Sequence, residues 1–457
     1  MRVLTIAHNA VALSNRQRVD ALRRLPDVEV TLLTPPWWYE EGRRVDARSI
    51  ARWRVGRTLF TGNGTRHVYL TGLFESVRKC TPDVIDLCEE PFSLVALQTL
   101  VARNLLAPHA ALVVYSAVNV ERAWRWPYRL IERVVLRNAD GAHAPNSDVP
   151  PILHRRGLRG LAEVIPLGVD ADRFASAEPL PLSDIPRPRI GFLGRFEPVK
   201  GLDVLLRAFA LLRASDSSPS AAPRRAPTDV PAPVPTSSHA AESSASSAAV
   251  LSSSSTQSPA SAPEPSASSM PELSGSSVPE PSPSSVPEPS PSPVAAPLRA
   301  SLVLAGDGSL RGNLGGPGVH VLPPLPFDQV PAFLKSLDVL VLPSVTILPL
   351  HREQFGRVLV EAMAAGVPVV GSSSGAIPEV IGEAGLIVPE RDAPALARAV
   401  AQVLTDAALR ARLIDLGRQR VASHFTWQAV AQQSVALFRS AMLHRRQATA
   451  QLEEVRA

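Results

Sequence analysis

The sequence predicts an α/β protein made of two doubly wound domains, with one long polar segment inserted in the second. Short apolar runs recur along the chain with helical patterns between them. This alternation is typical of parallel sheets covered by helices on both faces. With 457 residues the chain exceeds the usual size of a single core, so two domains are expected. Of the 45 prolines, 18 lie within residues 214–297, and this crowding marks the insertion.

Composition and charge favour a cytoplasmic protein with ordinary cores. Hydrophobic residues make up 45% of the chain, and the formal net charge is +5. Only Lys79, Lys200 and Lys335 are lysines, so arginine carries the generic charge and a retained lysine suggests a specific role. Cys80 and Cys88 lack the spacing of a metal site or a disulfide framework. No apolar run reaches the ~18 residues of a membrane span, and the N-terminal run is too short for a signal peptide.

The first domain is expected over residues 1–175. A buried strand at 3–7, a helix at 16–25 and a second strand at 28–33 make a βαβ unit. Further apolar runs, which we expect to form strands, lie at residues 84–87, 111–115, 141–145 and 162–166.

The second domain is expected over residues 189–425, after a proline-rich linker at 176–188. Two such domains in tandem imply a cleft between them, and ligands gather at the carboxyl ends of the strands. Residues 426–457 are expected to form a helix that packs back toward the first domain. The strands of the second domain are expected at 189–194, 302–306, 319–322, 339–342, 368–370 and 385–388.

The insertion, residues 214–297, is built from Ser, Pro, Ala and Glu and contains a tandem octapeptide at 276–291. Such a segment cannot bury enough apolar surface to offset its ordering entropy, so we expect it to be disordered. A passive insertion and a docking or phosphorylatable tether are both open roles for it.

A loop with two cations follows the first strand of the second domain. Gly194 lets the backbone approach a ligand, and Arg195 and Lys200 follow before the helix that starts at Leu202. A guanidinium and an ammonium together can clamp a diphosphate. A solvated basic loop is the alternative interpretation.

Two glutamates frame an expected helix start at Gly356. The free amides near Phe355 and Gly356 favour an anion. Glu353, just outside the helix, can accept hydrogen bonds from sugar hydroxyls, and Glu361, inside it, can accept them from a ribose. Two unrelated glutamates on an amphipathic helix would show the same spacing.

These segments resemble the donor-binding half of a retaining glycosyltransferase with the GT-B fold, of the large family 4 type (glycosyl transferases group 1). The most specific piece is the pair Glu353 and Glu361 with seven residues between them. The resemblance covers nearly the whole chain outside the insertion. Its other pieces are residues 194–201, 306–308, 339–344 and 374–379 in the second half, and 119–140 and 164–170 in the first.

The resemblance implies two Rossmann-like domains facing across a cleft. It implies metal-independent, retaining transfer of a hexosyl group from a UDP- or GDP-linked sugar to a glycan, lipid-linked or small-molecule acceptor, without a cofactor. Glu353 would position and stabilise the sugar, and Glu361 would bind the ribose. The implied catalytic residues are Glu353, Arg195 and Lys200, and the implied donor site is Gly194, Arg195, Lys200, Gln354, Phe355, Gly356 and Glu361.

Several alternative functions stay open beside the glycosyltransferase interpretation. A nucleotide-sugar 2-epimerase shares the two-domain fold. A degenerate transferase could serve as a partner-binding scaffold, since residues 312–318 are a short loop where relatives have a full helix. A glycosidase-like carboxylate pair is disfavoured, because Glu361 is expected to face the nucleotide.

The acceptor is expected to meet the first domain. His8, Asn15 and Asn119 are candidate contacts, although turn and capping hydrogen bonds would also explain them. No nucleic acid partner is expected. The first helix could carry a basic face made of Arg16, Arg18, Arg23 and Arg24. Such a face would suit an anionic inner membrane surface that carries a lipid-linked acceptor. The alternative is that these arginines are ordinary solvated charges.

Overall fold

The structure, a computed structural model, describes residues 1–40, 43–47, 53–214 and 299–456. All of these residues fall within one compact unit. From residue 215 onward the expected insertion lies outside the described residues. No helix in the described ranges is long and apolar enough to cross a membrane.

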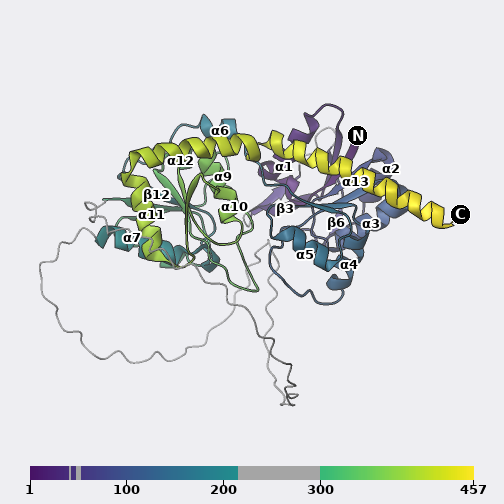
Figure 1. Ribbon diagram of the computed structural model, residues 1–457, viewed down its shortest axis with the longest axis horizontal. Coiled ribbons are helices and arrows are strands. Elements are labelled where there is room, and N and C mark those ends of the chain that lie inside the picture. Colours follow the sequence, from purple (N-terminus) through teal and green to yellow (C-terminus); the bar gives the residue numbers. More distant parts are fainter. Residues whose placement is uncertain (41–42, 48–52, 215–298, 457) are drawn as a thin grey trace, which may run out of the picture. The chain divides into compact units, whose positions relative to one another are not determined.

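The N-terminal domain is built on a seven-stranded parallel sheet. Its order is β11-β10-β9-β8-β1-β2-β5. The chain first adds β2 and β5 on one side of β1, and then returns to place β8 on the other side of β1, from where the sheet continues to β11. Helices cover both faces (Figure 1). The strands are β1 (Arg2–Ile6), β2 (Glu29–Thr34), β5 (Trp53–Val55), β8 (Val84–Leu87), β9 (Ala111–Tyr115), β10 (Gly141–Ala144) and β11 (Leu161–Val164); the helices are α1 (Leu13–Arg23), α2 (Leu73–Cys80), α3 (Leu94–Leu106), α4 (Tyr128–Asn138), α5 (Val149–Arg156) and α6 (Ala171–Ala175).

The second domain repeats this plan with six parallel strands in the order β14-β13-β12-β15-β16-β17. The direction of winding reverses between β12 and β15. The strands are β12 (Arg189–Leu193), β13 (Ser301–Ala305), β14 (Val319–Leu322), β15 (Val339–Leu342), β16 (Val369–Ser372) and β17 (Gly385–Val388); the helices are α7 (Leu202–Ala214), α8 (Val330–Lys335), α9 (Arg357–Ala364), α10 (Ile377–Ile381), α11 (Ala393–Thr405) and α12 (Ala407–Arg420).

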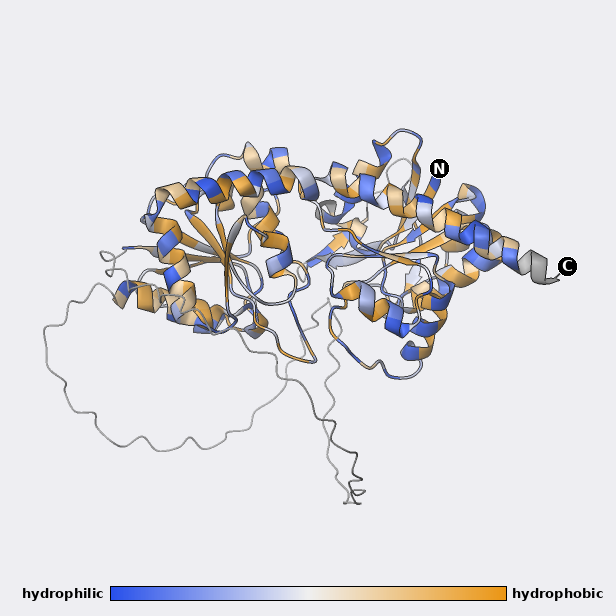
Figure 2. Ribbon diagram, viewed as in Figure 1, coloured by the Kyte–Doolittle hydropathy of each residue, from blue (hydrophilic) through white to orange (hydrophobic). Residues whose placement is uncertain are grey.

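The predicted fold class is confirmed in both domains. Strands β8, β9, β12 and β15 are buried along nearly their whole length, because helices cover both faces of a parallel sheet. The apolar runs seen in the sequence are these strands, and the polar residues lie on the outer faces of the helices (Figure 2).

The last helix, α13 (Trp427–Arg456), leaves the second domain and packs on the first. Val430, Phe438 and Ala441 of α13 are fully buried in one cluster with Val3 of β1 and Val113 of β9. The α13 ribbon lies alongside α1 (Figure 1). This helix therefore adds to the core of the first domain.

The region between β2 and α2 contains strands that the apolar pattern did not predict. β3 (Trp37–Glu40) pairs with β4 (Arg43–Asp46), and β6 (Thr58–Leu59) pairs with β7 (Val68–Tyr69). β5 adds a parallel edge strand next to β2. These strands have two to four residues each, too few for an alternating pattern to be recognised.

Candidate active site

The candidate residues meet at the point where the second sheet reverses its winding. Residues 194–200 follow β12 and residues 343–356 follow β15, and these two strands are hydrogen-bonded neighbours. In open α/β sheets this crevice, at the carboxyl ends of the strands, is where ligands bind. The topology therefore brings two segments about 150 residues apart in the sequence to the same place.

At the centre of this site Lys200 pairs with Glu353. The ammonium Nζ lies 2.6 Å from Glu353 Oε2, and the Ser344 hydroxyl donates to the same oxygen at 2.7 Å. The side chains are 14% and 7% exposed, so the ion pair is largely shielded from water. Burial alone would raise the pKa of Glu353, but the charge and hydrogen bond of Lys200, with help from Ser344, hold it below its usual value. Glu353 is therefore an ionised, hydrogen-bond-accepting carboxylate.

Two glycines allow the backbones around this pair to approach each other. Gly201 has φ +65°, and a Cβ there would lie 2.0 Å from the carbonyl oxygen of Pro343. Gly375 has φ +52°, and a Cβ there would lie 2.1 Å from the carbonyl oxygen of Glu353. Both positions need the left-handed conformation that glycine adopts without strain. These two close approaches of the backbone keep Lys200 and Glu353 within contact distance of each other.

Arg195 and His351 complete the charged surroundings of the pair. Arg195 is exposed. His351 lies within electrostatic reach of Glu353, Lys200 and Arg195, and burial lowers its pKa, with Lys200 and Arg195 acting in the same direction. Its buried Nε2 has no hydrogen-bond partner among the described residues. The sequence reading did not single out His351; its position two residues before Glu353 was the available signal.

The start of α9 lies directly beside this cluster. Gly356 has φ +77° and precedes the first helical residue, Arg357. Phe355 is 4% exposed and packs edge-on against Phe425, with ring centroids 5.9 Å apart. Glu361 is 9% exposed on the buried side of α9. The buried residues Phe355, before the helix start, and Glu361, after it, thus fix the position of the backbone amides at the start of α9.

The first domain holds the backbone of the Glu353–Gln354 segment. Asn119 Nδ2 donates to the Glu353 carbonyl at 3.0 Å, and Asn146 Nδ2 donates to the Gln354 carbonyl at 2.5 Å. Gln354 Nε2 in turn donates to the carbonyl of Ala117 at 2.8 Å. The Gln354 side chain is therefore directed at the first domain, and the Asn119 amide is occupied by the candidate catalytic segment.

Comparison with known proteins finds similarity to a known family in the second domain. Residues 292–406, which contain Glu353 and Glu361, match the profile of the family described as glycosyl transferases group 1. This part of the chain is similar to the group 1 glycosyl transferases. The MMP alpha-(1->4)-mannosyltransferase of Mycolicibacterium hassiacum is 36% identical over 127 residues, which are 27% of this chain and 29% of that relative. The alignment thus spans less than a third of the relative's length.

Solved structures share the architecture over nearly the full length. Sucrose-phosphate synthase from Thermosynechococcus elongatus superimposes with a TM-score of 0.58 at 18% identity, covering 96% of this chain and 98% of that one. Anabaena HepE in complex with UDP and glucose gives 0.57 at 14% identity, covering 96% and 100%. At such identities the likeness concerns the fold, and this chain has the two-domain GT-B fold.

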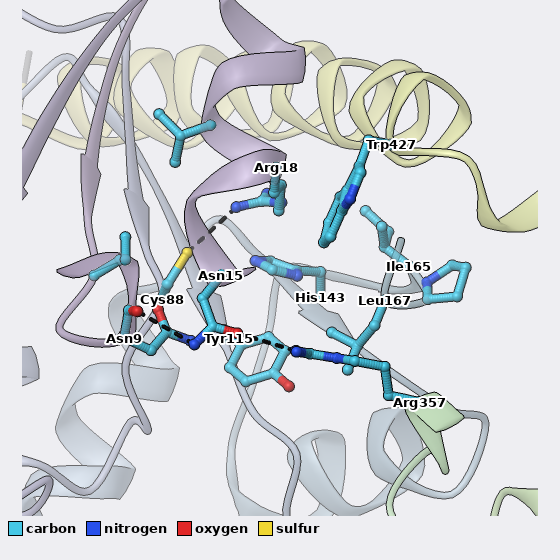
Figure 3. Close-up of a pocket in the computed structure, with 14 residues that line it drawn as sticks. Asn9, Asn15, Arg18, Cys88, Tyr115, His143, Ile165, Leu167, Arg357 and Trp427 are labelled. Atoms are coloured by element: carbon cyan, nitrogen blue, oxygen red, sulfur yellow. Dashed lines mark hydrogen bonds between the residues drawn. The ribbon is translucent and has the colours of Figure 1, made fainter. Parts of the chain in front are cut away.

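A pocket lies at the carboxyl end of the first sheet. It holds about 630 Å³ of empty space, part of it open to solvent. Asn15 and Arg357 meet across it, with Arg357 Nη2 donating to Asn15 Oδ1 at 3.0 Å (Figure 3). The pocket is lined by Ala7, Asn9, Ala10, Asn15, Arg18, Val19, Cys88, Tyr115, His143, Ile165, Pro166, Leu167, Arg357 and Trp427. Asn15 thus lies next to the start of α9, and its role as an acceptor contact stays a prediction.

His8 lies beside this pocket in a buried cluster. Its Nδ1 is 2.5 Å from Glu89 Oε2, and its backbone N–H donates to Glu89 Oε1 at 2.8 Å. His67 Nε2 is 3.7 Å from the same carboxylate. Burial would raise the pKa of Glu89, but His8 and His67 hold it below its usual value. His8 therefore belongs to an oriented carboxylate–imidazole pair with its ring 24% exposed.

Two groups among the described residues have the composition of a metal site. One is His8, His67 and Glu89, and the other is Asp86, Cys88 and His143. In the second group Arg18 already supplies positive charge, since its Nη1 lies 2.8 Å from Asp86 Oδ2. Asp86 is fully buried, and Arg18 and His143 hold its pKa far below the usual value against the effect of burial. An arginine at this place leaves no need for a cation there.

The first helix does not present the free basic face expected from its sequence. Arg18 is turned inward to Asp86, Cys88 and Ser434. Arg16 and Arg23 both reach Asp20, at 3.6 and 3.5 Å. Of these four arginines, Arg24 is exposed and the other three are partly buried. The prediction failed because the acids that neutralise this helix come partly from β8, far away in the sequence.

Proposed function

We propose that this protein is a retaining glycosyltransferase that moves a hexosyl group from a nucleotide-sugar to an acceptor hydroxyl. The observation that carries the proposal is the buried Lys200–Glu353 pair at the reversal point of the second sheet, with Ser344 bound to the same carboxylate oxygen. A shielded cation beside an ionised carboxylate suits a ligand that has a diphosphate next to a polyhydroxyl sugar.

Lys200 and Arg195 would bind the diphosphate. Lys200 has three ammonium hydrogens and Glu353 takes one, so donors remain for phosphate oxygens. Arg195 is exposed at the edge of the site and can close over the same group as a fork. The amides at the start of α9 add partial positive charge at the other side. These groups would stabilise the leaving nucleotide diphosphate without a metal.

Glu353 would position the sugar and stabilise the positive charge that develops on it. An ionised carboxylate only accepts hydrogen bonds, which suits sugar hydroxyls. Lys200 and Ser344 occupy Oε2, and this leaves Oε1 as the oxygen for the substrate. A carboxylate held in this way is a weaker nucleophile, so we assign Glu353 an electrostatic role. Glu361, deeper in α9, would bind the ribose.

Transfer would proceed on the face from which the phosphate departs. The acceptor oxygen forms a bond to the anomeric carbon as the bond from that carbon to the phosphate oxygen breaks, and the acceptor proton passes to the departing phosphate. The sugar thus keeps its anomeric configuration. In this scheme Arg195 and Lys200 stabilise the charge gained by the diphosphate.

The acceptor would enter from the first domain, where His8 and Asn15 lie at the carboxyl ends of the strands and Asn119 already touches the Glu353 segment. A glycan, a lipid-linked sugar and a small polyol all fit this chemistry. HepE, which shares the fold, is known in complex with UDP and glucose. That makes UDP-glucose the first donor to test, ahead of GDP-sugars.

The test is a panel of nucleotide-sugars incubated with the protein, with and without candidate acceptors. A transferase releases the nucleotide slowly alone and faster with its acceptor, and the new linkage keeps the donor configuration in the NMR spectrum. An epimerase would instead convert the sugar without any acceptor. A scaffold, favoured only by the single 3-10 turn Arg311–Asn313 between β13 and β14, would bind without turnover. Inversion of configuration would contradict the proposal.

A further inference from the structure

One surface of the first domain combines unpaired positive charge with exposed large apolar side chains. It follows Asn119 in the sequence and includes the outer side of α4. We call it the α4 surface and define it as Arg125, Trp126, Arg129, Leu130, Arg133 and Arg137. All six residues are exposed, with Trp126 at 81% and Leu130 at 52%.

Five of the six residues form a continuous stripe, and Trp126 lies two positions before the first residue of α4. On α4 the positions 129, 133, 137 and 130 lie within roughly a 100° arc, because each residue advances by about 100°. The opposite side of the helix is buried through Ile131, Glu132, Val135 and Leu136. Arg125 continues the stripe one turn earlier, where its carbonyl accepts the Arg129 amide. The helix thus turns a basic and apolar side outward while its other side holds the domain core.

The arginines of this surface have no ion-pair or side-chain hydrogen-bond partner within the described part of the chain. The two acids in the same stretch are already neutralised. Glu121 pairs with Arg155 at 2.6 Å, and Glu132 pairs with Arg156 at 2.8 Å. The positive charge is therefore not compensated locally and is available to an external anion.

The segment that carries Trp126 is held in place by neighbouring residues. The Trp124 ring packs on Phe92 with centroids 3.9 Å apart, and its Nε1 donates to Glu132 at 3.1 Å. Arg156 donates to the Arg122 carbonyl at 2.8 Å. One tryptophan thus anchors the segment and the other, two residues later, points to solvent. A fixed, 81% exposed indole has no structural role on the inside of the fold.

We propose that the α4 surface docks on an anionic lipid bilayer. Exposed arginines on a helix that is not long enough to span, with an exposed tryptophan just before the first helical residue, are typical of interfacial binding. Trp126 and Leu130 would lie at the level of the headgroups, where amphipathic rings are favoured. The four arginines would bind lipid phosphates. The exposed apolar side chains of Trp126 and Leu130, which alternate with the arginines, favour a lipid interface over a partner held mainly by phosphate contacts, such as a nucleic acid.

The test is co-sedimentation of the full chain with vesicles of phosphatidylcholine alone and with about a third phosphatidylglycerol. Binding is expected on the anionic vesicles and should weaken with salt. The double variant Arg129→Glu/Arg133→Glu should lower the partition coefficient at least about 30-fold, since each basic residue near such a surface contributes roughly fivefold. Trp126→Ala should weaken binding even at high salt, where the arginines are screened.

A matched control changes the same charge elsewhere. Arg398 on α11 and Arg412 on α12 are exposed, and Arg398→Glu/Arg412→Glu should bind vesicles as the wild type does. All variants should keep the wild-type melting temperature, because only exposed side chains change. Equal loss in the control, equal binding to neutral vesicles, or tighter binding of RNA or heparin than of anionic vesicles would each overturn the membrane assignment.

Discussion

Lys200 Nζ lies 2.6 Å from Glu353 Oε2, and these two residues come from loops on neighbouring strands of the second sheet. Neither charge would be stable at this depth without the other. The pair therefore has two consequences that can be measured separately: it supports the fold of both loops, and it fixes the ionisation of a carboxylate that faces the proposed sugar site.

Replacing Glu353 with Gln tests the electrostatic role of this carboxylate. Glu353→Gln keeps the size and an accepting oxygen but removes the negative charge. We expect kcat to fall by roughly 10²–10³-fold while the nucleotide diphosphate still binds, because the lost interaction acts mainly in the transition state. Steady-state kinetics and calorimetric binding of the nucleotide measure the two effects. A wild-type kcat would refute the assignment.

Glu90 predicts a pH dependence of stability. Its carboxyl accepts from the Ser116 hydroxyl at 2.7 Å and the Ala117 amide at 2.9 Å, and burial raises its pKa to about 7 despite these bonds. The folded state therefore binds this proton more tightly than the unfolded state. The stabilising contribution is complete below the unfolded pKa, about 4.3, and is lost as pH rises through about 7.

Glu90→Gln should remove this dependence. Urea unfolding at pH 5.5 and pH 8 should show the wild type losing on the order of 2 kcal/mol more than the variant over that interval. Ala117 links Glu90 to the candidate site, because its amide donates to Glu90 and its carbonyl accepts from Gln354. The affinity for the nucleotide-sugar should therefore follow the same pH trend. Parallel pH profiles for the two proteins would contradict the role of Glu90.

Gly201 predicts a strong effect of a single methyl group. Gly201→Ala would force a left-handed residue and place Cβ 2.0 Å from the Pro343 carbonyl oxygen. We expect a loss of about 2–4 kcal/mol in the free energy of unfolding, together with weaker donor binding. Gly312→Ala is the control, since nothing lies within 4 Å of a Cβ there. Equal stability of the two variants would show that the loops are not in close contact.

Much of the fold could be predicted from local pattern, because strands buried on both faces read as continuous apolar runs. The runs at 84–87 and 111–115 are β8 and β9, residue for residue. The short strands between β2 and α2 could not be predicted, since their pairing depends on contacts rather than on periodicity. The single 3-10 turn Arg311–Asn313 agrees with the short loop expected there.

The candidate site could be assembled only in part from the sequence. The residues Arg195, Lys200 and Glu353 were identified by their positions at strand ends and by resemblance. Ser344 and His351 were missed as site residues, because their roles arise from contacts that the fold creates. Arg18 was misjudged for the same reason: its partner Asp86 is 68 residues away in the sequence.

The most direct test of the account is calorimetric titration of the donor, UDP-glucose first, into the Lys200→Ala variant, with Lys79→Ala as the control. Lys79 is an exposed lysine whose ion-pair partner among the described residues is Glu75, one turn away on α2, so its loss should leave affinity unchanged. We predict that Lys200→Ala abolishes measurable binding of the donor that the wild type and the control bind. An unchanged affinity in Lys200→Ala would contradict the assignment of the diphosphate site.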